Sequence, residues 1–277
     1  MSIGPLPEVR NLQFPVGERI PRFWHGERKS VTQFYNNLSV FFPAGERFFI
    51  ASVKAYRDEI AHDPALAAEA RAFYAQESIH SREHVRYNHM LRAQGYPIDA
   101  MEGRVERVLA RVTRVYPPRM RLAVTCALEH FTALMADMLL QDPRVLAGAD
   151  PVMTKLWRWH AAEENEHKAV AFDVFKAVGG SYFERVVTMI GATIIFWAKV
   201  IEQQVRMMHA DGTAWNPLEW ARLLAYLFVK PGAMLRIIPK YFSYFRPGFH
   251  PWDHDNRALL EAWKDELRET PDYGEVA

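Results

Sequence analysis

The chain of 277 residues has a formal net charge of +1 at pH 7, and 49% of its residues are hydrophobic, which is the composition of an ordinary soluble globular protein. A net charge near zero argues against non-specific binding to nucleic acid or to an anionic membrane. The single cysteine, Cys126, excludes an internal disulfide framework and a metal cluster held by several thiolates. A free thiol fits a reducing compartment, and the first 17 residues lack the apolar core of a secretory signal, so we expect a cytoplasmic protein.

The N-terminal part of the chain consists of an irregular arm followed by two long helices. Residues 1–30 are rich in proline and are expected to form the arm. A first helix is predicted over residues 43–61, because proline is tolerated in the first turn of a helix. Asp63 is a natural N-cap for a second helix, which begins with a proline and is predicted over residues 64–95.

The following segments continue the helical pattern. Residues 96–117 are expected to connect two long helices and to contain only a short helix around residues 106–112. Further long helices are predicted over residues 118–141, 151–178 and 182–209, each bounded by proline, glycine or an N-cap residue. The last third of the chain carries clustered proline, glycine and aromatic residues, which predict short helices and ordered loops.

The longest apolar run lies at residues 186–198. It is shorter than the ~20 residues that a helix needs to span a bilayer, so no transmembrane segment is expected. We interpret the run as a helix buried in the protein rather than one in contact with a membrane. Strand patterns are poor throughout, and the chain is therefore predicted to be all-α, with a four-helix bundle and additional C-terminal helices.

Two stretches of the chain, QESIHSREH and AEENEHKAV, carry the same acid–imidazole pair. Each has a Glu followed three residues later by a His: Glu77 with His80, and Glu164 with His167. On a helix, residues three apart lie on nearly the same face, so each pair can point at one metal ion. A single pair of this kind is most often a pair of solvated surface residues, and further ligands are needed to support a site.

The helix before each pair contains one acid among hydrophobic residues, Glu46 in the first case and Glu129 in the second. The order Glu, Glu-x-x-His, Glu, Glu-x-x-His is the one with which four-helix bundles hold two carboxylate-bridged metal ions. All four acids lie about 13–15 residues from their interhelical turns, or ~20 Å at ~1.5 Å per residue, so they are matched in height. Four buried carboxylates repel one another, and two divalent cations would remove that repulsion. The residues predicted to bind two metal ions and to form the catalytic centre are Glu46, Glu77, His80, Glu129, Glu164 and His167.

Three neighbouring residues are additional or alternative metal ligands. His84 lies one turn beyond the first pair and is either an extra ligand, a hydrogen-bond partner of a ligand or a half-exposed polar residue. His160 lies four residues before Glu164, on the same helical face. Glu163 is an alternative to Glu164, but Glu164 is preferred because it repeats the spacing of the first pair.

Other polar residues near the motifs have structural and functional interpretations. Tyr74, Thr125 and Thr132 lie at helical spacing from the ligands. A radical or hydrogen-bonding role beside the metals is one interpretation of Tyr74, and contact with bound oxygen is one interpretation of the two threonines, but packing in the core is preferred for all three. His130 directly follows Glu129 and should point about 100° away, where it packs or caps elsewhere. A second polar cluster, for which a loop over the end of the bundle is preferred to a metal site, contains His250, Asp253 and His254.

These motifs resemble those of the ferritin-like superfamily of di-iron carboxylate proteins. More narrowly, the segments SVFFPAGERFF, QESIHSREH, ALEHFTA, HAAEENEHKAVAFDVF and RPGFHPWD are similar to a bacterial family described as predicted metal-dependent hydrolases, over about residues 25–260. We therefore expect one ferritin-like helical domain over residues 1–277. It would consist of an arm at 1–30, a metal-binding bundle at 31–178, and appended helices and loops at 179–277.

Two enzymatic chemistries fit the predicted ligands. The preferred expectation is an oxidase or oxygenase in which two iron ions, or manganese with iron, activate dioxygen and oxidise a small apolar substrate, with an electron donor as partner. The alternative is a hydrolase in which the metals lower the pKa of a bound water, a role that zinc or manganese also fills. The resemblance implies this alternative. Metal storage or oxidation without an organic substrate is a third interpretation. No nucleic-acid partner is expected, and a homodimer is compatible with the sequence.

Overall fold

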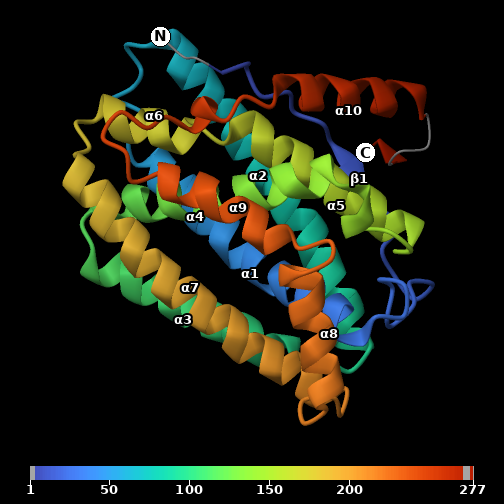
Figure 1. Ribbon diagram of the computed structural model, residues 1–277. Helices are drawn as coiled ribbons and strands as arrows, with labels where there is room; N and C mark the ends of the chain where they lie inside the picture. Colours follow the sequence, from blue (N-terminus) through green and yellow to red (C-terminus); the bar gives the residue numbers. More distant parts are fainter. Residues whose placement is uncertain (1–3, 271–274, 277) are drawn as a thin grey trace.

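A computed structural model describes residues 4–270 and 275–276, and these residues form an all-α architecture with one short pair of strands (Figure 1). The prediction of an all-α fold, with a four-helix bundle and further helices after it, is confirmed. The ends of the predicted domain, residues 1–3, 271–274 and 277, lie outside the described residues.

Two helical hairpins form the bundle. Helix α1 (Lys29–Lys54) packs against α2 (Pro64–Ala93), and α4 (Pro118–Gln141) packs against α5 (Pro151–His167). Contacts of α1 with α4 and of α2 with α5 join the two hairpins. The bundle interior is therefore lined by four helices that are far apart in the sequence.

The remaining elements cover this bundle. Helix α7 lies along α4 and α1, α3 packs on α1, α9 packs on α4, and α10 packs on α5 (Figure 1). The short strands β1 and β2 pair antiparallel and join the N-terminal arm to the C-terminal end of the described chain. The bounds of these elements are β1 Leu12–Gln13, α3 Ile98–Val115, η1 Pro143–Val145, α6 Val170–Ala177, α7 Tyr182–Ala210, α8 Pro217–Phe228, α9 Ala233–Ser243, η2 Pro251–Asp253, α10 Arg257–Glu269 and β2 Glu275–Val276.

Helix starts follow the capping residues of the sequence. The side chain of Asp63 accepts hydrogen bonds from the backbone N–H groups of the second and third residues of α2, both at 3.1 Å. Asp150 makes the same kind of cap before Pro151 at the start of α5. The predicted starts of α2, α4 and α5 are therefore confirmed, because proline at the first helical position needs no N–H partner.

The prediction of a first helix over residues 43–61 is wrong at both ends, because α1 begins at Lys29 and ends at Lys54. The first half of α1 is buried on every side, so it lacks the polar face by which a surface helix is recognised. Its polar side chains are hydrogen-bonded inside the protein: Asn36 accepts from Trp24 at 2.9 Å, and Asn37 donates to a backbone carbonyl of α7 at 2.8 Å.

Pro43 lies in the interior of α1 rather than at its start. A proline has no N–H, so the carbonyl oxygen of Ser39, one turn earlier, loses its donor within the helix. Asn88 of α2 donates from Nδ2 to this oxygen at 3.3 Å. The neighbouring helix thus replaces the missing hydrogen bond. The sequence of α1 alone cannot predict this contact.

Two further predicted elements differ from the structure. Residues 96–117 contain the continuous helix α3 instead of a short one, because its apolar side packs on α1 while arginines occupy the opposite side. The helix predicted over residues 151–178 is broken after His167, and α6 continues from Val170. Between them Lys168 donates from Nζ to the backbone carbonyl of His254 at 2.8 Å, which ties the break to the C-terminal segment.

Residues 186–198 are helical as predicted, but the prediction that they are buried is wrong. Within residues 4–270 and 275–276, two helices, α4 and α7, are long and apolar enough to cross a membrane by length and composition alone. Helix α4 lies in the bundle, and 78% of its apolar window is buried. Only 28% of the corresponding window of α7 is buried, so this helix exposes its apolar side chains.

Candidate metal centre

The bundle brings the six predicted ligands to one place. They are Glu46 of α1, Glu77 and His80 of α2, Glu129 of α4, and Glu164 and His167 of α5. Each of them is at most 3% exposed. One group of ligand atoms within 4.8 Å of one another comes from Glu77, His80 and Glu164, and a second comes from Glu77, Glu129 and His167. The cluster thus offers two adjacent positions that share Glu77.

The atoms that face the inside of this cluster have no hydrogen-bond partner within the described protein. They are both carboxylate oxygens of Glu46, Glu77 and Glu129, with Glu164 Oε2, His80 Nδ1 and His167 Nε2. Buried polar atoms are nearly always paired, so such a set demands another partner. Carboxylate and imidazole groups at this spacing are a ligand set for divalent transition metals. The residues present therefore fit a pair of divalent cations.

The carboxyl groups of the cluster cannot all ionise in the protein without cations. Burial, together with the charges of Glu77 and Glu164, raises the pKa of Glu46 and of Glu129 well above the usual value. Burial alone would also raise the pKa of Glu164, but contacts with His160 and His167 outweigh it and hold that pKa well below its usual range. Bound cations would favour the ionised form of every carboxyl group in the cluster.

The orientation of His167 is set by hydrogen bonds on its far side. Gln76 donates from Nε2 to the backbone carbonyl of Glu8 and to Glu166 Oε2, at 3.0 and 2.9 Å. Its amide oxygen must therefore face His167 Nδ1, 2.9 Å away, and His167 donates to it. His167 Nε2 is thereby directed into the cluster, 3.1 Å from Glu77 Oε1. A metal-binding histidine usually has its other nitrogen held in this way. Burial would lower the pKa of His167, but its contacts with Glu164 and Glu77 outweigh burial and raise this pKa well above the usual value, so a bound cation would replace a proton here.

His80 is held from behind by a buried carboxyl group. Its Nε2 lies 3.0 Å from Glu163 Oε2, while Nδ1 faces the cluster. Glu163 accepts in addition from Trp159 Nε1 at 2.9 Å, and its Oε1 lies 3.3 Å from a guanidinium nitrogen of Arg10. Burial raises the pKa of Glu163 to about 8 although the charge of Arg10 opposes the rise. An acid of α5 thus orients His80 directly, and a second acid of α5, Glu166, acts on His167 only through Gln76.

Arg10 of the N-terminal arm forms ion pairs with both Glu163 and Glu166. One guanidinium nitrogen contacts Glu163, and the other lies 2.8 Å from Glu166 Oε1. The sequence analysis missed Arg10, Gln76 and Glu166. Gln76 and Glu166 stand directly before a predicted ligand, and this adjacency was a usable signal. Arg10 lies in an irregular segment without any pattern, so no local signal could have found it.

The additional ligands named from the sequence take different places. Glu163 lies behind His80, as described, while Glu164 lies in the cluster. A third group of ligand atoms within 4.8 Å comes from Glu46, His80 and His160. His84 belongs to none of the three groups, and its Nε2 lies 2.7 Å from His160 Nδ1. The binding of metal by any of these residues stays a prediction.

The two threonines predicted to contact bound oxygen are hydrogen-bonded within the protein, whereas the Tyr74 hydroxyl group is not. Thr125 Oγ1 lies 2.7 Å from Ser52 Oγ, and Thr132 Oγ1 donates to the backbone carbonyl of Glu129 at 3.0 Å. Tyr74 is half-buried, and its hydroxyl group has no hydrogen-bond partner. Thr132 alone of these three also lines the apolar pocket described below.

The remaining polar candidates lie outside the cluster. The ring of His130 packs against that of Tyr244, with centroids 4.8 Å apart, as expected for a side chain that points away from the ligands. The residues of the second polar cluster are paired separately rather than directed at one point. His250, Asp253 and His254 contact Asp173, Arg246 and Ser243, respectively.

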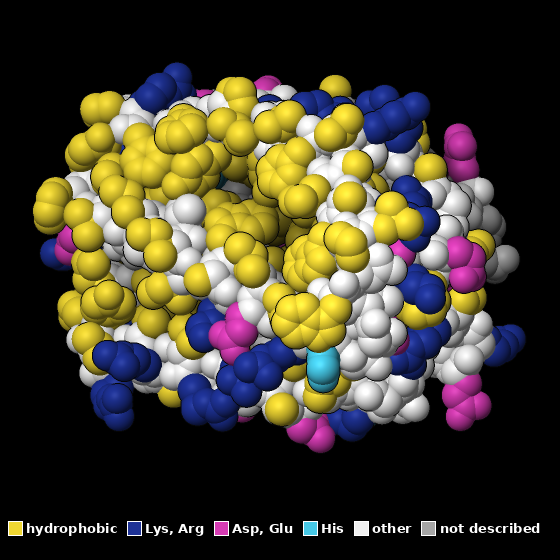
Figure 2. All heavy atoms as spheres, turned by 60° about the horizontal axis from the view of Figure 1, so that its bottom comes forward, with side chains coloured by type: hydrophobic (Ala, Val, Ile, Leu, Met, Phe, Trp, Pro, Cys, Tyr) yellow, Lys and Arg dark blue, Asp and Glu magenta, His cyan; other side chains and the backbone are white. Residues whose placement is uncertain are grey.

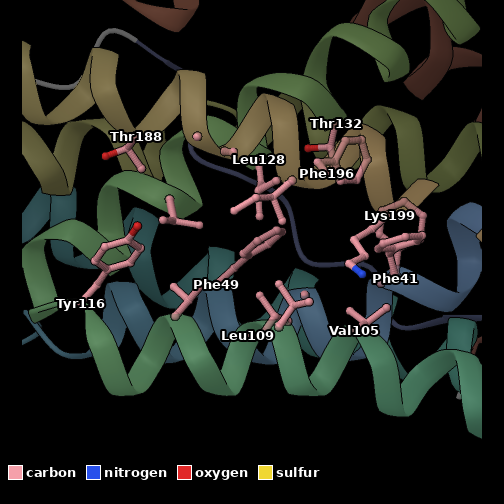
Figure 3. Close-up of a pocket in the computed structure, with 18 of the residues that line it drawn as sticks. Phe41, Phe49, Val105, Leu109, Tyr116, Leu128, Thr132, Thr188, Phe196 and Lys199 are labelled. Carbon is pink, nitrogen blue, oxygen red and sulfur yellow. The ribbon is translucent and has the colours of Figure 1, made fainter. Parts of the chain in front are cut away.

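An apolar pocket approaches the cluster from one side. A cavity of about 60 Å³ between α1, α4, α5, α8 and α9 has Glu164 and His160 in its wall. A larger one of about 160 Å³ lies between α1, α3, α4 and α7, where side chains of all four helices point into a common space (Figure 3). The two share Leu38, Phe42, Thr132 and Met135 as walls. The smaller cavity thus adjoins the cluster, and the larger one lies beyond the shared side chains, between α3 and α7.

Replacing Gln76 by Leu is expected to weaken metal binding about 10–100-fold, because His167 loses the acceptor that fixes its ring and its protonated nitrogen. Competition with a chromophoric chelator measures this affinity. Gln203→Leu is the matched control, because Gln203 is also buried but donates to the backbone carbonyl of Met101, away from the cluster. Equal affinities of the two variants would contradict the role given to Gln76.

A family model described as "Predicted metal-dependent hydrolase" matches residues 8–255. The matched segment contains the six clustered residues and the arm residue Arg10 behind them. No curated protein and no solved structure matches the chain.

Proposed function

The chain belongs to the family of predicted metal-dependent hydrolases, and from this we propose that it cleaves an ester or amide bond in a substrate with an extended apolar part. The observation that carries the proposal is the buried carboxylate–imidazole cluster that adjoins an apolar pocket. Two divalent ions held by the six clustered residues would lower the pKa of a bound water and polarise a carbonyl group. Zinc, manganese and iron all suit this ligand set.

The lining of the pocket supports one class of substrate. Its larger part is lined almost entirely by aliphatic and aromatic side chains, among them Phe49, Leu109, Leu128 and Phe196 (Figure 3). No Lys or Arg lines the smaller part, next to the cluster, in the described chain. A phosphate ester would find no cationic partner there, whereas an acyl chain would bury its whole length. An acyl ester or amide is therefore the substrate class that we propose.

A chain of hydrogen bonds places a proton at the wall of the pocket. Asn88 donates from Nδ2 to the backbone carbonyl of Ser39, so its amide oxygen accepts from Ser39 Oγ at 2.9 Å. The hydroxyl group then accepts from His84 Nδ1, and His84 Nε2 accepts from His160 Nδ1 at 2.7 Å. The next proton is held between His160 Nε2 and Glu164 Oε1, 3.0 Å apart. In our proposal this pair exchanges a proton with the leaving group of the substrate.

The dioxygen chemistry that the sequence analysis preferred has no support from the family match, which favours the hydrolase instead. The iron ions, dioxygen and electron donor of that interpretation stay predictions. Oxygen uptake after anaerobic loading with ferrous iron would distinguish this chemistry from hydrolysis, because the hydrolytic reaction consumes no oxygen.

Protein loaded with zinc or manganese is expected to hydrolyse p-nitrophenyl esters, with kcat/KM rising about four-fold per added methylene group of the acyl chain until the pocket is filled. The factor follows from ~0.8 kcal/mol per buried methylene group. Release of p-nitrophenol measures the rates, and chelated protein should be inactive. Oxygen uptake without ester cleavage by ferrous protein would instead support the oxidative alternative.

Gly191→Leu provides the matched pocket variant for this series. Gly191 lies in α7 and lines the larger cavity, and a Cβ added there meets no atom within 4 Å. The new side chain should fill the pocket without strain and should remove the gain from long acyl chains while short esters react normally. Gly103→Leu, on α3 outside the pocket lining, is the control for effects of losing a helical glycine.

A further inference from the structure

The outer side of α7 is an apolar stripe. Exposed hydrophobic side chains recur at the three- and four-residue spacing that places them on one helical face. They are Phe183, Val187, Ile190, Ile194, Ile201 and Val205. The most exposed of the isoleucines, Ile194, is 66% exposed. No charged residue occurs between Arg185 and Lys199, so a stretch of three turns offers solvent only apolar or small side chains.

The inner side of α7 combines core hydrophobic residues, such as Met189 and Met207, with buried polar side chains that fix the helix to its neighbours. Gln203 and Gln204 are buried and donate to backbone carbonyl groups of α3 and α1 at 2.9 and 3.1 Å. Arg185 is buried near the other end and donates to the backbone carbonyl of Arg246 at 2.7 Å. These bonds hold the helix flat against the protein with its apolar side outward.

Helices α8 and α9 extend the apolar surface. Their exposed hydrophobic side chains include Leu224, Phe228, Leu235 and Phe242, and Val229 lies between the two helices. Figure 2 shows this face of the molecule, where hydrophobic side chains gather around a hollow and lysine and arginine side chains lie toward the margins. We call the exposed apolar surface of α7, α8 and α9 the apolar face. Contiguous apolar surfaces of this kind mark interaction sites.

Several basic residues without an ion pair within the described chain lie around the apolar face. Residues 181–249 contain eight Lys and Arg residues and four Asp and Glu residues, but Arg236, Lys240 and Arg246 also pair with Asp142, Asp137 and Asp253 from outside this segment. Exposed Lys230 forms no ion pair within the described chain. Across the mouth of the pocket, α3 adds the exposed residues Arg107, Arg111 and Arg114, which form no ion pair within the described chain. The unpaired basic residues beside the apolar face are therefore, among the described residues, these three arginines and Lys230, and they could meet an anionic surface.

We propose that the apolar face docks on the surface of an anionic lipid bilayer and places the mouth of the pocket against the acyl chains. An apolar centre with a basic margin is the pattern of proteins that lie in the membrane interface. The large cavity opens between α3 and α7, beside this face (Figure 2). The docking does not depend on the catalytic chemistry. That the substrate is an acyl lipid component taken from the bilayer rests on the proposed function.

A bilayer fits the apolar face better than a second copy of the chain. In a two-fold dimer the same surface meets itself, so the basic margins of both copies would come together and repel. A second copy would also cover the mouth of the pocket. A transmembrane course of α7 is disfavoured, because the buried Arg185, Gln203 and Gln204 fix this helix to the protein along its length.

Sedimentation with phospholipid vesicles tests the docking without any measurement of activity. The full-length protein is expected to bind vesicles of phosphatidylcholine with phosphatidylglycerol, and to bind pure phosphatidylcholine at least about ten-fold more weakly, since each basic residue near an anionic surface contributes. The double variant Ile194→Glu, Ile201→Glu should bind the mixed vesicles at least about 100-fold more weakly, because two side chains leave the apolar contact. Arg111→Gln with Arg114→Gln should reduce the difference between the two lipid mixtures.

Leu6→Glu is the matched control, because Leu6 is 62% exposed but lies on the N-terminal arm, outside the apolar face. It should bind vesicles like the wild type. Circular dichroism and metal content should be unchanged in every variant, since all the substitutions are at exposed positions. Equal binding by the wild type and the double isoleucine variant would overturn the proposal. The proposal would also be overturned if the wild type did not bind vesicles and instead formed a dimer, measured by size exclusion with light scattering, while the double variant was a monomer.

Discussion

Glu129→Gln is expected to abolish stoichiometric metal binding and all metal-dependent hydrolysis. Glu129 is the only acid that α4 contributes to the cluster, and its carboxylate shares a ligand group with Glu77 and His167. The amide keeps the shape of the side chain but removes the negative charge. Loss of a ligand should exceed the about 10–100-fold loss typical for a hydrogen-bond partner of a ligand. Metal analysis after gel filtration measures the effect.

The same substitution should stabilise the metal-free protein. Burial and the charges of Glu77 and Glu164 raise the pKa of Glu129, which means that its ionised form is disfavoured in the folded state. With chelator present, the free energy of unfolding should therefore rise by about 1 kcal/mol or more at neutral pH, by the equivalence of pKa and free energy. Urea unfolding measures it.

The control for both effects is Glu106→Gln. Glu106 is an exposed acid of α3 that pairs only with exposed Arg47, and its replacement should change neither metal content nor stability appreciably. A chelated Glu129→Gln protein that is markedly less stable than chelated wild type would show that the cluster is not repulsive without cations. A Glu129→Gln protein that retains two ions would remove this residue from the ligand set.

Arg10→Met is expected to lower the free energy of unfolding by about 3–5 kcal/mol, the usual cost of removing one partner from a buried ion pair. Glu166 is 3% exposed and would keep a buried carboxylate without this cation, whereas Glu163, whose pKa lies at about 8, would remain largely protonated at neutral pH. Lys264 Nζ, 3.7 Å from Glu166 Oε1, offsets only part of the loss. Urea unfolding gives the value directly.

The double variant Arg10→Met, Glu166→Gln tests the cause of this destabilisation. Removing the second charge should restore part of the stability if unpaired charge is responsible. Arg47→Met breaks an exposed pair and should cost less than about 1 kcal/mol. A loss of similar size in Arg10→Met and Arg47→Met would mean that the arm contributes little to holding the acids behind His80.

Much of the cluster was predictable because its residues repeat at helical spacing. The three-residue spacing of Glu77 and His80, and of Glu164 and His167, places each pair on a common helical face, and this can be inferred without any knowledge of the fold. The alternatives to these residues could not be separated in this way. Glu163 and Glu164 both lie within one turn of His167, and only the position of Arg10, more than 150 residues away, shows which acid lies behind the histidines.

The helix ends and the exposure of α7 were less predictable for a related reason. A proline usually begins or breaks a helix, and only Asn88 of the next helix explains why Pro43 lies inside α1. An apolar run suggests burial because most such runs are in cores. The orientation of α7 depends instead on Gln203 and Gln204, whose partners lie in other helices. Local sequence patterns therefore predict where helices form. They do not predict which face of each helix is covered by the rest of the protein.

Burial of the cluster determines how an ion reaches it. Each clustered residue is at most 3% exposed, and the pocket that leads to them is lined by apolar groups. Carrying a divalent charge through such a wall is very costly, so exchange with solvent requires a transient separation of the helices. An ion captured while the chain folds should then leave only as fast as this opening occurs. The metal in the protein should therefore reflect the supply of ions during folding, and not the order of equilibrium affinities among divalent metals.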